Sequence, residues 1–155
     1  SKRKGTSNRR ERGSARDRMP HVVFANRLEA IRSLVERRPH SVPFHKPVNR
    51  RAVPRYYEVI SNPIDLSTIR EKIHKYVYPN ADAFLRDFEL MKNNAIRFNT
   101  AEAPLSKEAV AIYEFVKSEI NDNRAELEAM VEAVENQLNN KKPRKGGTAK
   151  APKPG

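Results

Sequence analysis

The side chains that could catalyse a reaction or hold a metal ion are spread along this chain without the spacing that either task needs. The four histidines are scattered, and none lies at ligand spacing from another histidine or from a carboxylate. Acidic pairs such as Asp82 and Asp87 fall on the polar face of an expected helix, where solvation explains them. No nucleophile, base and orienting group come together in the sequence. We therefore expect no catalytic residue, no metal ligand and no cofactor, and we favour a binding protein over an enzyme.

Residue types that are missing exclude further classes of protein. The chain has no cysteine, which excludes disulfide frameworks, thiol catalysis, zinc knuckles and iron–sulfur clusters. Residues 14–145 contain no glycine, although phosphate-binding loops need glycines where the backbone approaches the phosphate closely. No apolar run is long enough to span a membrane, and no signal-peptide pattern is present. We expect neither a nucleotide-binding loop nor a membrane contact.

Apolar residues recur at helical spacing through the middle of the chain, and no alternating run predicts a strand. The spacing predicts one helix from Pro20 to the residue before Pro39, a second after Asp65, a third that ends near Asn99, and a long fourth from Leu105. The first two helices are joined by a proline-rich loop over residues 40–64, and a loop of that length inside a domain is usually functional. The sequence therefore predicts an all-α protein, an antiparallel four-helix bundle.

The last helix is expected to extend well past the bundle, to about residue 140. Its apolar seam beyond Leu127 has a spacing near 3.5 residues, and residues 106–140 carry eight acidic side chains against three basic ones. Two interpretations stay open. Either the seam packs on a neighbouring domain or on a second copy of the chain, or the helix frays into solvent.

The net charge of +12 is confined to the two ends of the chain. Residues 1–19 and residues 141–155 each carry a charge of +6, while residues 20–140 are neutral. Both ends are polar, with almost nothing to bury, so we expect two disordered basic tails around one domain over residues 20–140. Non-specific contact with nucleic acid, nuclear import and solubility are equally good roles for these tails.

Three motifs, in the same order and near the same spacing, resemble the bromodomain family. Residues 43–48 match the PF-x-x-PV start of the family's long loop, residues 56–66 match YY-x-x-I-x-x-P-x-D-L, and residues 94–99 match the NA-x-x-[YF]-N end of a helix. Together they cover about residues 20–120. The resemblance implies a left-handed bundle of four helices, named Z, A, B and C, that binds acetylated lysine.

The same resemblance assigns roles to eight residues. Asn99 matches the asparagine whose side-chain amide donates to the acetyl carbonyl, and Tyr56 matches the tyrosine that reaches this oxygen through a water molecule. The others enclose the acetyl group or support the loop: Pro43, Phe44, Val48, Val53, Phe98 and Leu105. This chemistry suits a neutral amide, because an unmodified ammonium in such a sleeve would lack a partner.

Several positions depart from the family pattern. Val42 stands where many members have Trp, which implies a smaller outer shelf. Arg55 replaces a common Asp, and Arg50 and Arg51 add charge at the loop rim. These arginines would disfavour a peptide rich in unmodified lysine and favour acidic or acetylated neighbours. Phe98 replaces the usual Tyr, so a hydroxyl that can brace the loop is lost.

Within the family, residues 43–49 and 77–79 are similar to the tandem bromodomains of the largest subunit of the general transcription factor TFIID, which implies a neighbouring bromodomain. The expected function is a nuclear reader of acetylated histone tails, or of other acetylated nuclear proteins, in transcription regulation. Two alternatives stay open. One is a nucleic-acid-associated scaffold that works through its basic tails, and the other is a ligand-free bundle that dimerises through its last helix.

Overall fold

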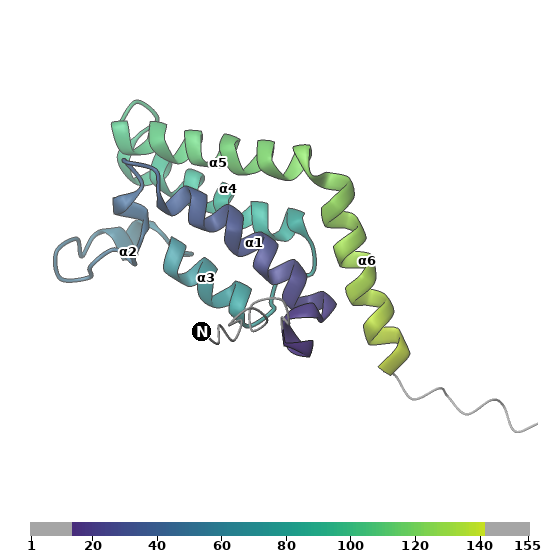
Figure 1. Ribbon diagram of the computed structural model, residues 1–155. Coiled ribbons are helices and arrows are strands. Elements are labelled where there is room, and N and C mark those ends of the chain that lie inside the picture. The colour runs from purple at the N-terminus through teal and green to yellow at the C-terminus, as the bar shows by residue number, and fades with distance from the viewer. Residues whose placement is uncertain (1–13, 142–155) are drawn as a thin grey trace, which may run out of the picture.

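The computed structural model describes residues 14–141, and this part of the chain is helical without any strand (Figure 1). The bundle helices are α1 (Pro20–Glu36), α3 (Leu66–His74), α4 (Ala81–Asn99) and α5 (Pro104–Asp122). The remaining elements are η1 (Ala15–Arg18), η2 (Val42–Phe44), α2 (Tyr56–Val59) and α6 (Arg124–Lys141). The predicted all-α fold is confirmed. Residues 1–13 and 142–155 of the two predicted disordered tails lie outside the described residues. The rest of the N-terminal tail, residues 14–19, is described and includes η1.

The helices begin where the sequence supplies a cap or a proline. Pro20 and Pro104 occupy the first position of α1 and α5, where the missing backbone N–H would have no partner in any case. Asp65 caps α3, and its carboxylate accepts the backbone N–H groups of Ser67 at 2.9 Å and Thr68 at 3.1 Å. The Asp65 cap fixes where the long loop between α1 and α3 ends.

The core is built from the apolar stripes that the sequence predicts. Phe84 and Phe88 of α4 are fully buried and meet edge to face with ring centres 5.0 Å apart. Residues of α1, α3 and α5 complete the same cluster: Leu28, Ile31, Val35, Leu66, Ile69, Ile112 and Val116. The four helices therefore pack around one core, and this core fixes the positions of the helix ends on both sides of the bundle.

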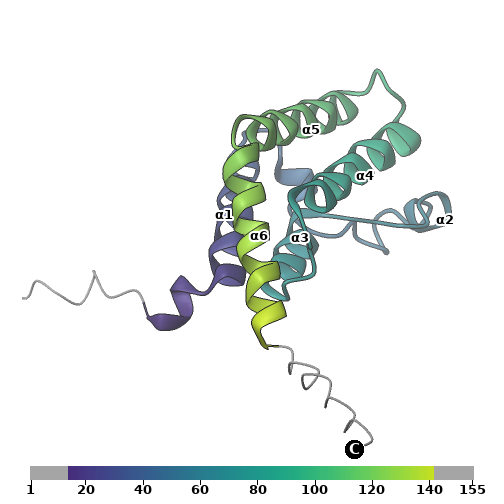
Figure 2. The same ribbon diagram turned by 90° about the vertical axis from the view of Figure 1, so that its right-hand side faces the viewer.

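The last helix is broken at Asn123, so the expectation of one long helix from Leu105 is wrong. Asn123 ends α5, and its side-chain Nδ2 donates to the Glu119 carbonyl at 2.8 Å. From there α6 turns and runs beside α1 (Figure 2). Leu127 is only 1% exposed, and the apolar seam that follows it packs against the core of the same chain. The seam that the sequence assigns to a neighbour or to solvent therefore covers α1.

Candidate binding site

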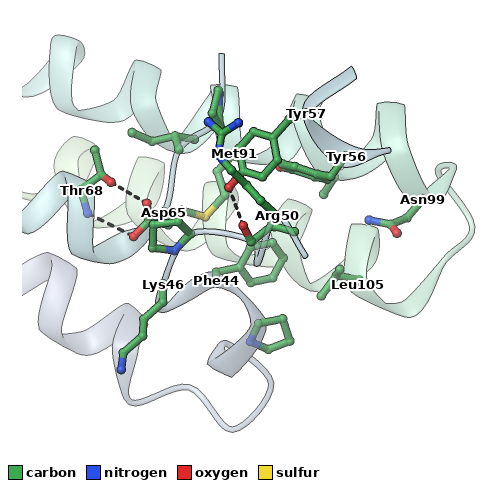
Figure 3. Close-up of a pocket in the computed structure, with 16 residues that line it drawn as sticks. Phe44, Lys46, Arg50, Tyr56, Tyr57, Asp65, Thr68, Met91, Asn99 and Leu105 are labelled. Atoms are coloured by element: carbon green, nitrogen blue, oxygen red, sulfur yellow. Dashed lines mark hydrogen bonds between the residues drawn. The ribbon is translucent and has the colours of Figure 1, made fainter. Parts of the chain in front are cut away.

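A cavity of about 300 Å³ opens at one end of the bundle, between the α1–α3 loop and the start of α5 (Figure 3). Six of the eight predicted site residues line it: Pro43, Phe44, Val48, Tyr56, Asn99 and Leu105. They come from η2, the loop, α2, α4 and α5. The fold therefore brings together residues that are more than sixty positions apart in the sequence.

Asn99 is the last residue of α4. The next residue, Thr100, has a φ of 70° and takes the chain out of the helix, while its N–H donates to the Ile96 carbonyl at 2.9 Å. The Asn99 side chain points from the helix end toward the loop residues on the opposite wall (Figure 3). Within residues 14–141 its carboxamide makes no hydrogen bond, so both amide hydrogens and the carbonyl oxygen remain available to a ligand.

Tyr56 and Tyr57 begin α2 and meet edge to face. The Tyr57 hydroxyl donates to the Val48 carbonyl at 2.5 Å, and this bond fixes the loop across the cavity. The Tyr56 hydroxyl has no partner in the described part of the chain. Burial, with smaller contributions from Tyr57 and Asp65, raises the pKa of the Tyr56 phenol, so this group stays protonated at neutral pH. Tyr56 thus presents a neutral hydroxyl to the cavity.

The other two predicted site residues, Phe98 and Val53, contact Tyr56 and are not among the residues that line the cavity. The Phe98 ring lies 5.0 Å from the Tyr56 ring, edge to face, and so supports it from the side. The Val53 carbonyl accepts the Tyr56 N–H at 3.1 Å, and the Val53 N–H donates to Asn49 at 2.9 Å. Both residues position Tyr56 and do not face the cavity themselves.

The long loop is tied to the bundle at both ends. Near its start, the His45 carbonyl accepts the Ser67 N–H at 3.1 Å. Near its end, the buried Asn94 of α4 donates from Nδ2 to the Asn62 carbonyl at 2.9 Å. Buried polar side chains need such partners, so this bond also explains why Asn94 tolerates its position in the core. The loop is held as an ordered wall of the cavity.

Among the described residues, none offers the cavity a carboxylate that is available to a cation. Its one acidic lining residue, Asp65, is 5% exposed and already accepts bonds from the α3 backbone and from the Thr68 hydroxyl, the latter at 2.5 Å. An unmodified lysine in this cavity would therefore lose its hydration without gaining a counter-charge, which disfavours it.

Sequence reasoning missed two further lining residues on α4, Met91 and Ala95. They precede Asn99 at intervals of four and so share its face of the helix. The same spacing predicts a core stripe, and both residues are indeed buried. Tyr57, Lys46 and Arg50 also line the cavity without having been predicted to do so.

No group of three or more histidine or acidic side chains within residues 14–141 is arranged to hold a metal ion. None of the helices described has both the length and the apolar character to cross a membrane.

The model of the bromodomain family matches residues 28–111, more than half of the chain. The chain belongs to the bromodomain family. Bromodomains are binding modules that read acetylated lysine in chromatin and transcription proteins, and they are not catalytic. Five of the six cavity residues named above, all except Leu105, come from the motifs by which the sequence resembles this family.

Relatives of this bromodomain are chromatin and transcription proteins. It is 34% identical to the histone acetyltransferase GCN5 of Debaryomyces hansenii over 68% of this chain and 23% of the relative. It is 31% identical to transcription initiation factor TFIID subunit 1 of Drosophila melanogaster over 64% of this chain and 5% of the relative. The TFIID subunit thus appears among the relatives, as the resemblance indicates. The chain spans less than a quarter of either protein.

A solved bromodomain, that of human BAZ1A, has a similar structure. The two share 32% identity with a TM-score of 0.58, over 62% of this chain and 90% of the other.

Proposed function

We propose that this bromodomain binds acetylated lysine in histone tails, or in other acetylated nuclear proteins, as part of transcription regulation in the nucleus. The observation that carries the proposal is the unpartnered Asn99 carboxamide, which points into a cavity without a free carboxylate. A ligand for this cavity must be neutral, must offer one acceptor, and must end in a small apolar group. Acetyl-lysine has all three properties.

The lining supports a specific mode of binding. The Asn99 amide would donate to the acetyl carbonyl, and the Tyr56 hydroxyl would reach the same oxygen through a water molecule. Phe44, which is 8% exposed, closes the inner end, where the acetyl methyl group would lie. Val48 and Leu105 would flank the lysine stem. With so few polar contacts, the affinity for a single mark should be modest.

The test is the affinity for acetylated and unmodified histone-tail peptides, measured by calorimetry with the wild-type chain and two asparagine variants. Asn99→Ala should weaken binding of the acetylated peptide by about 1–3 kcal/mol, because the acetyl carbonyl would be buried without a donor. Asn93→Ala is the matched control, since Asn93 lies exposed on the same helix, and it should leave the affinity unchanged. Equal affinity for the unmodified peptide, or no effect of Asn99→Ala, would contradict the proposal.

Two parts of the prediction extend beyond the described residues. The basic tails would add non-specific contacts to nucleic acid through counterion release. A neighbouring bromodomain in the same polypeptide would raise the effective concentration of a second site.

A further inference from the structure

Four basic side chains lie on the part of the α1–α3 loop that forms one wall of the cavity. They are Lys46, Arg50, Arg51 and Arg55, and residues 46–55 contain no acidic residue. All four are exposed, and two of them, Lys46 and Arg50, also line the cavity itself. We call these four residues the basic rim. Because Lys46 and Arg50 line the cavity, a peptide whose acetyl-lysine enters it would place neighbouring residues close to this rim.

The basic rim is unpaired, whereas basic residues on the bundle helices are often paired. Arg32 of α1 lies 2.6 Å from Glu29, and Lys72 of α3 lies 2.6 Å from Asp87. Within residues 14–141, by contrast, no carboxylate comes within 4.0 Å of a basic group of the rim. The neutral charge balance of residues 20–140 therefore conceals a local excess of positive charge at the cavity mouth.

The loop holds the rim in place. The Asn49 side chain accepts the backbone N–H groups of Arg51 at 2.8 Å and Ala52 at 3.1 Å, which fixes the turn. The Arg50 guanidinium lies 4.0 Å from the centre of the Tyr57 ring, and Tyr57 is itself bonded to the loop. A guanidinium that is already positioned loses little freedom when it meets an anion.

Exposed carboxylates near the mouth do not cancel this charge. Glu58 is exposed on α2 and makes no ion pair in the described part of the chain. Glu102, in the loop after Asn99, lies 3.8 Å from Lys107. With Asp65, which lines the cavity, these make three acidic residues against the four basic residues of the rim, so the local charge is still net positive.

We propose that the basic rim makes this bromodomain select acetyl-lysine that is flanked by anionic residues. The inference rests on the proposed function and adds a preference for the sequence around the mark. Flanking carboxylates would pair with Arg50 and Arg51, while flanking unmodified lysines would be repelled by them. Phosphoserine offers the same anionic oxygens as Asp and Glu, so the test includes both kinds of anion.

The test uses the full chain and a set of peptides with one central acetyl-lysine and identical length. Their flanking positions carry Glu, phosphoserine, Gln or unmodified Lys, and a fifth peptide combines Glu flanks with an unmodified central lysine. At low salt we expect the Glu peptide to bind about fivefold tighter than the Gln peptide, in the range of two exposed ion pairs, and the Lys peptide to bind weakest. The ratio should shrink as salt is raised. A stronger gain with phosphoserine than with Glu would identify phosphate as the preferred anion.

The variant Arg50→Ala/Arg51→Ala should bring the Glu-to-Gln affinity ratio close to one. The matched control is Arg70→Ala/Arg86→Ala, which removes the same charge from exposed positions on α3 and α4 that make no ion pair among the described residues. Arg86 lies about 20 Å from Asn99 along α4, so the control should keep the ratio. The basic ends of the chain are the same in all variants and cannot produce the difference.

The outcomes separate the two proposals. If none of the acetylated peptides binds, or if the fifth peptide binds as well as its acetylated counterpart, the proposed function fails. If the Gln peptide binds through Asn99 but the Glu peptide binds no better, only the preference for anionic flanks is overturned. A ratio that survives in Arg50→Ala/Arg51→Ala would likewise overturn the role of the rim.

Discussion

Tyr56 and Tyr57 are adjacent in the chain, and their hydroxyls have different environments. The Tyr57 hydroxyl is bonded to the loop at Val48, whereas the Tyr56 hydroxyl has no partner within residues 14–141. The first bond is part of the fold. The second hydroxyl is available to a ligand or to a water molecule that the ligand holds, so the two residues separate a structural role from a binding role.

Replacing either tyrosine with phenylalanine should therefore change a different property of the protein, the stability for Tyr57 and the peptide affinity for Tyr56. Tyr57→Phe removes a hydrogen bond and should lower the free energy of unfolding by about 1 kcal/mol, seen as a Tm lower by about 3 °C. Tyr56→Phe should leave Tm unchanged and weaken the acetylated peptide by a few-fold, through the lost water-mediated bond. Calorimetric titration and thermal unfolding of both variants provide the check. A lower Tm in Tyr56→Phe would show that its hydroxyl has a structural partner.

A third tyrosine links stability to pH at the other end of the bundle. The Tyr78 side chain is 7% exposed, and its hydroxyl donates to Asp87 Oδ2 at 2.5 Å. Burial, and then the bond to Asp87, raises the pKa of this phenol above its ordinary value of 10.0. In the unfolded chain the phenol ionises near pH 10, while the folded protein keeps the proton. The contribution of Tyr78 to stability is therefore full below pH 10 and is lost as the pH rises further.

We expect the free energy of unfolding of the wild type to fall between about pH 9.5 and pH 11, because the phenol of the unfolded chain ionises at about pH 10. The free energy of unfolding of Tyr78→Phe should fall less steeply over the same range. Tyr76→Phe, at an exposed position nearby, should keep the wild-type slope. Denaturant unfolding at several pH values measures these slopes. Equal slopes in all three proteins would contradict this role of Tyr78.

Six of the eight predicted site residues line the cavity, because most of them stand in family motifs. Asn99, Tyr56 and Phe44 stand at defined positions in strings that also set the loop length. Met91 and Ala95 could not be told apart from core residues, since a helix face that lines a deep cavity has the same apolar spacing as one that is fully packed. The sequence also could not predict that the basic rim makes no ion pair, because a sequence shows the charges but not the distances between them.

At the scale of elements, α6 is the part that the sequence predicts least well. No glycine or proline marks the break at Asn123, and the apolar seam continues across it at nearly constant spacing. Whether such a seam meets a partner or turns back is decided by packing. Here α1 offers apolar surface that α5 leaves uncovered, and the turn at Asn123 brings the seam onto it.

Leu127→Ala tests this account of α6. The Leu127 side chain is 1% exposed, so its truncation should lower the free energy of unfolding by about 2–5 kcal/mol. Leu138→Ala is the matched control, because Leu138 lies on the same helix at 58% exposure, and its effect should stay within about 0.5 kcal/mol. Denaturant unfolding gives both values. Similar small effects at both positions would mean that α6 contributes little to the folded state in solution.

At the scale of the whole molecule, charge and packing are divided between different parts of the chain. The packed helices belong to a neutral segment, and the excess charge lies at the ends of the sequence. Binding to a small neutral mark and binding to a charged polymer should therefore be separable.

A chain limited to residues 14–141 should keep its affinity for the acetylated peptide within about twofold and lose most of its low-salt affinity for duplex DNA, since phosphate contacts follow the number of cations. Fluorescence anisotropy with a labelled DNA duplex and with a labelled peptide measures both. The full chain is the reference. Unchanged DNA affinity in the shortened chain would place the DNA contact on the helical domain, with the basic rim as the first candidate.

The turn at Asn123 also separates two surfaces. The cavity adjoins the first turn of α3 and the last of α4, whereas α6 lies against the start of α1 and near the end of α3. An anchor attached to an exposed side chain of α6, such as a biotin bound to a sensor chip, would leave the recognition face turned toward the solution. By the same geometry, a protein that binds α6 and a peptide that binds beside Asn99 would not compete for space, and both could bind at the same time.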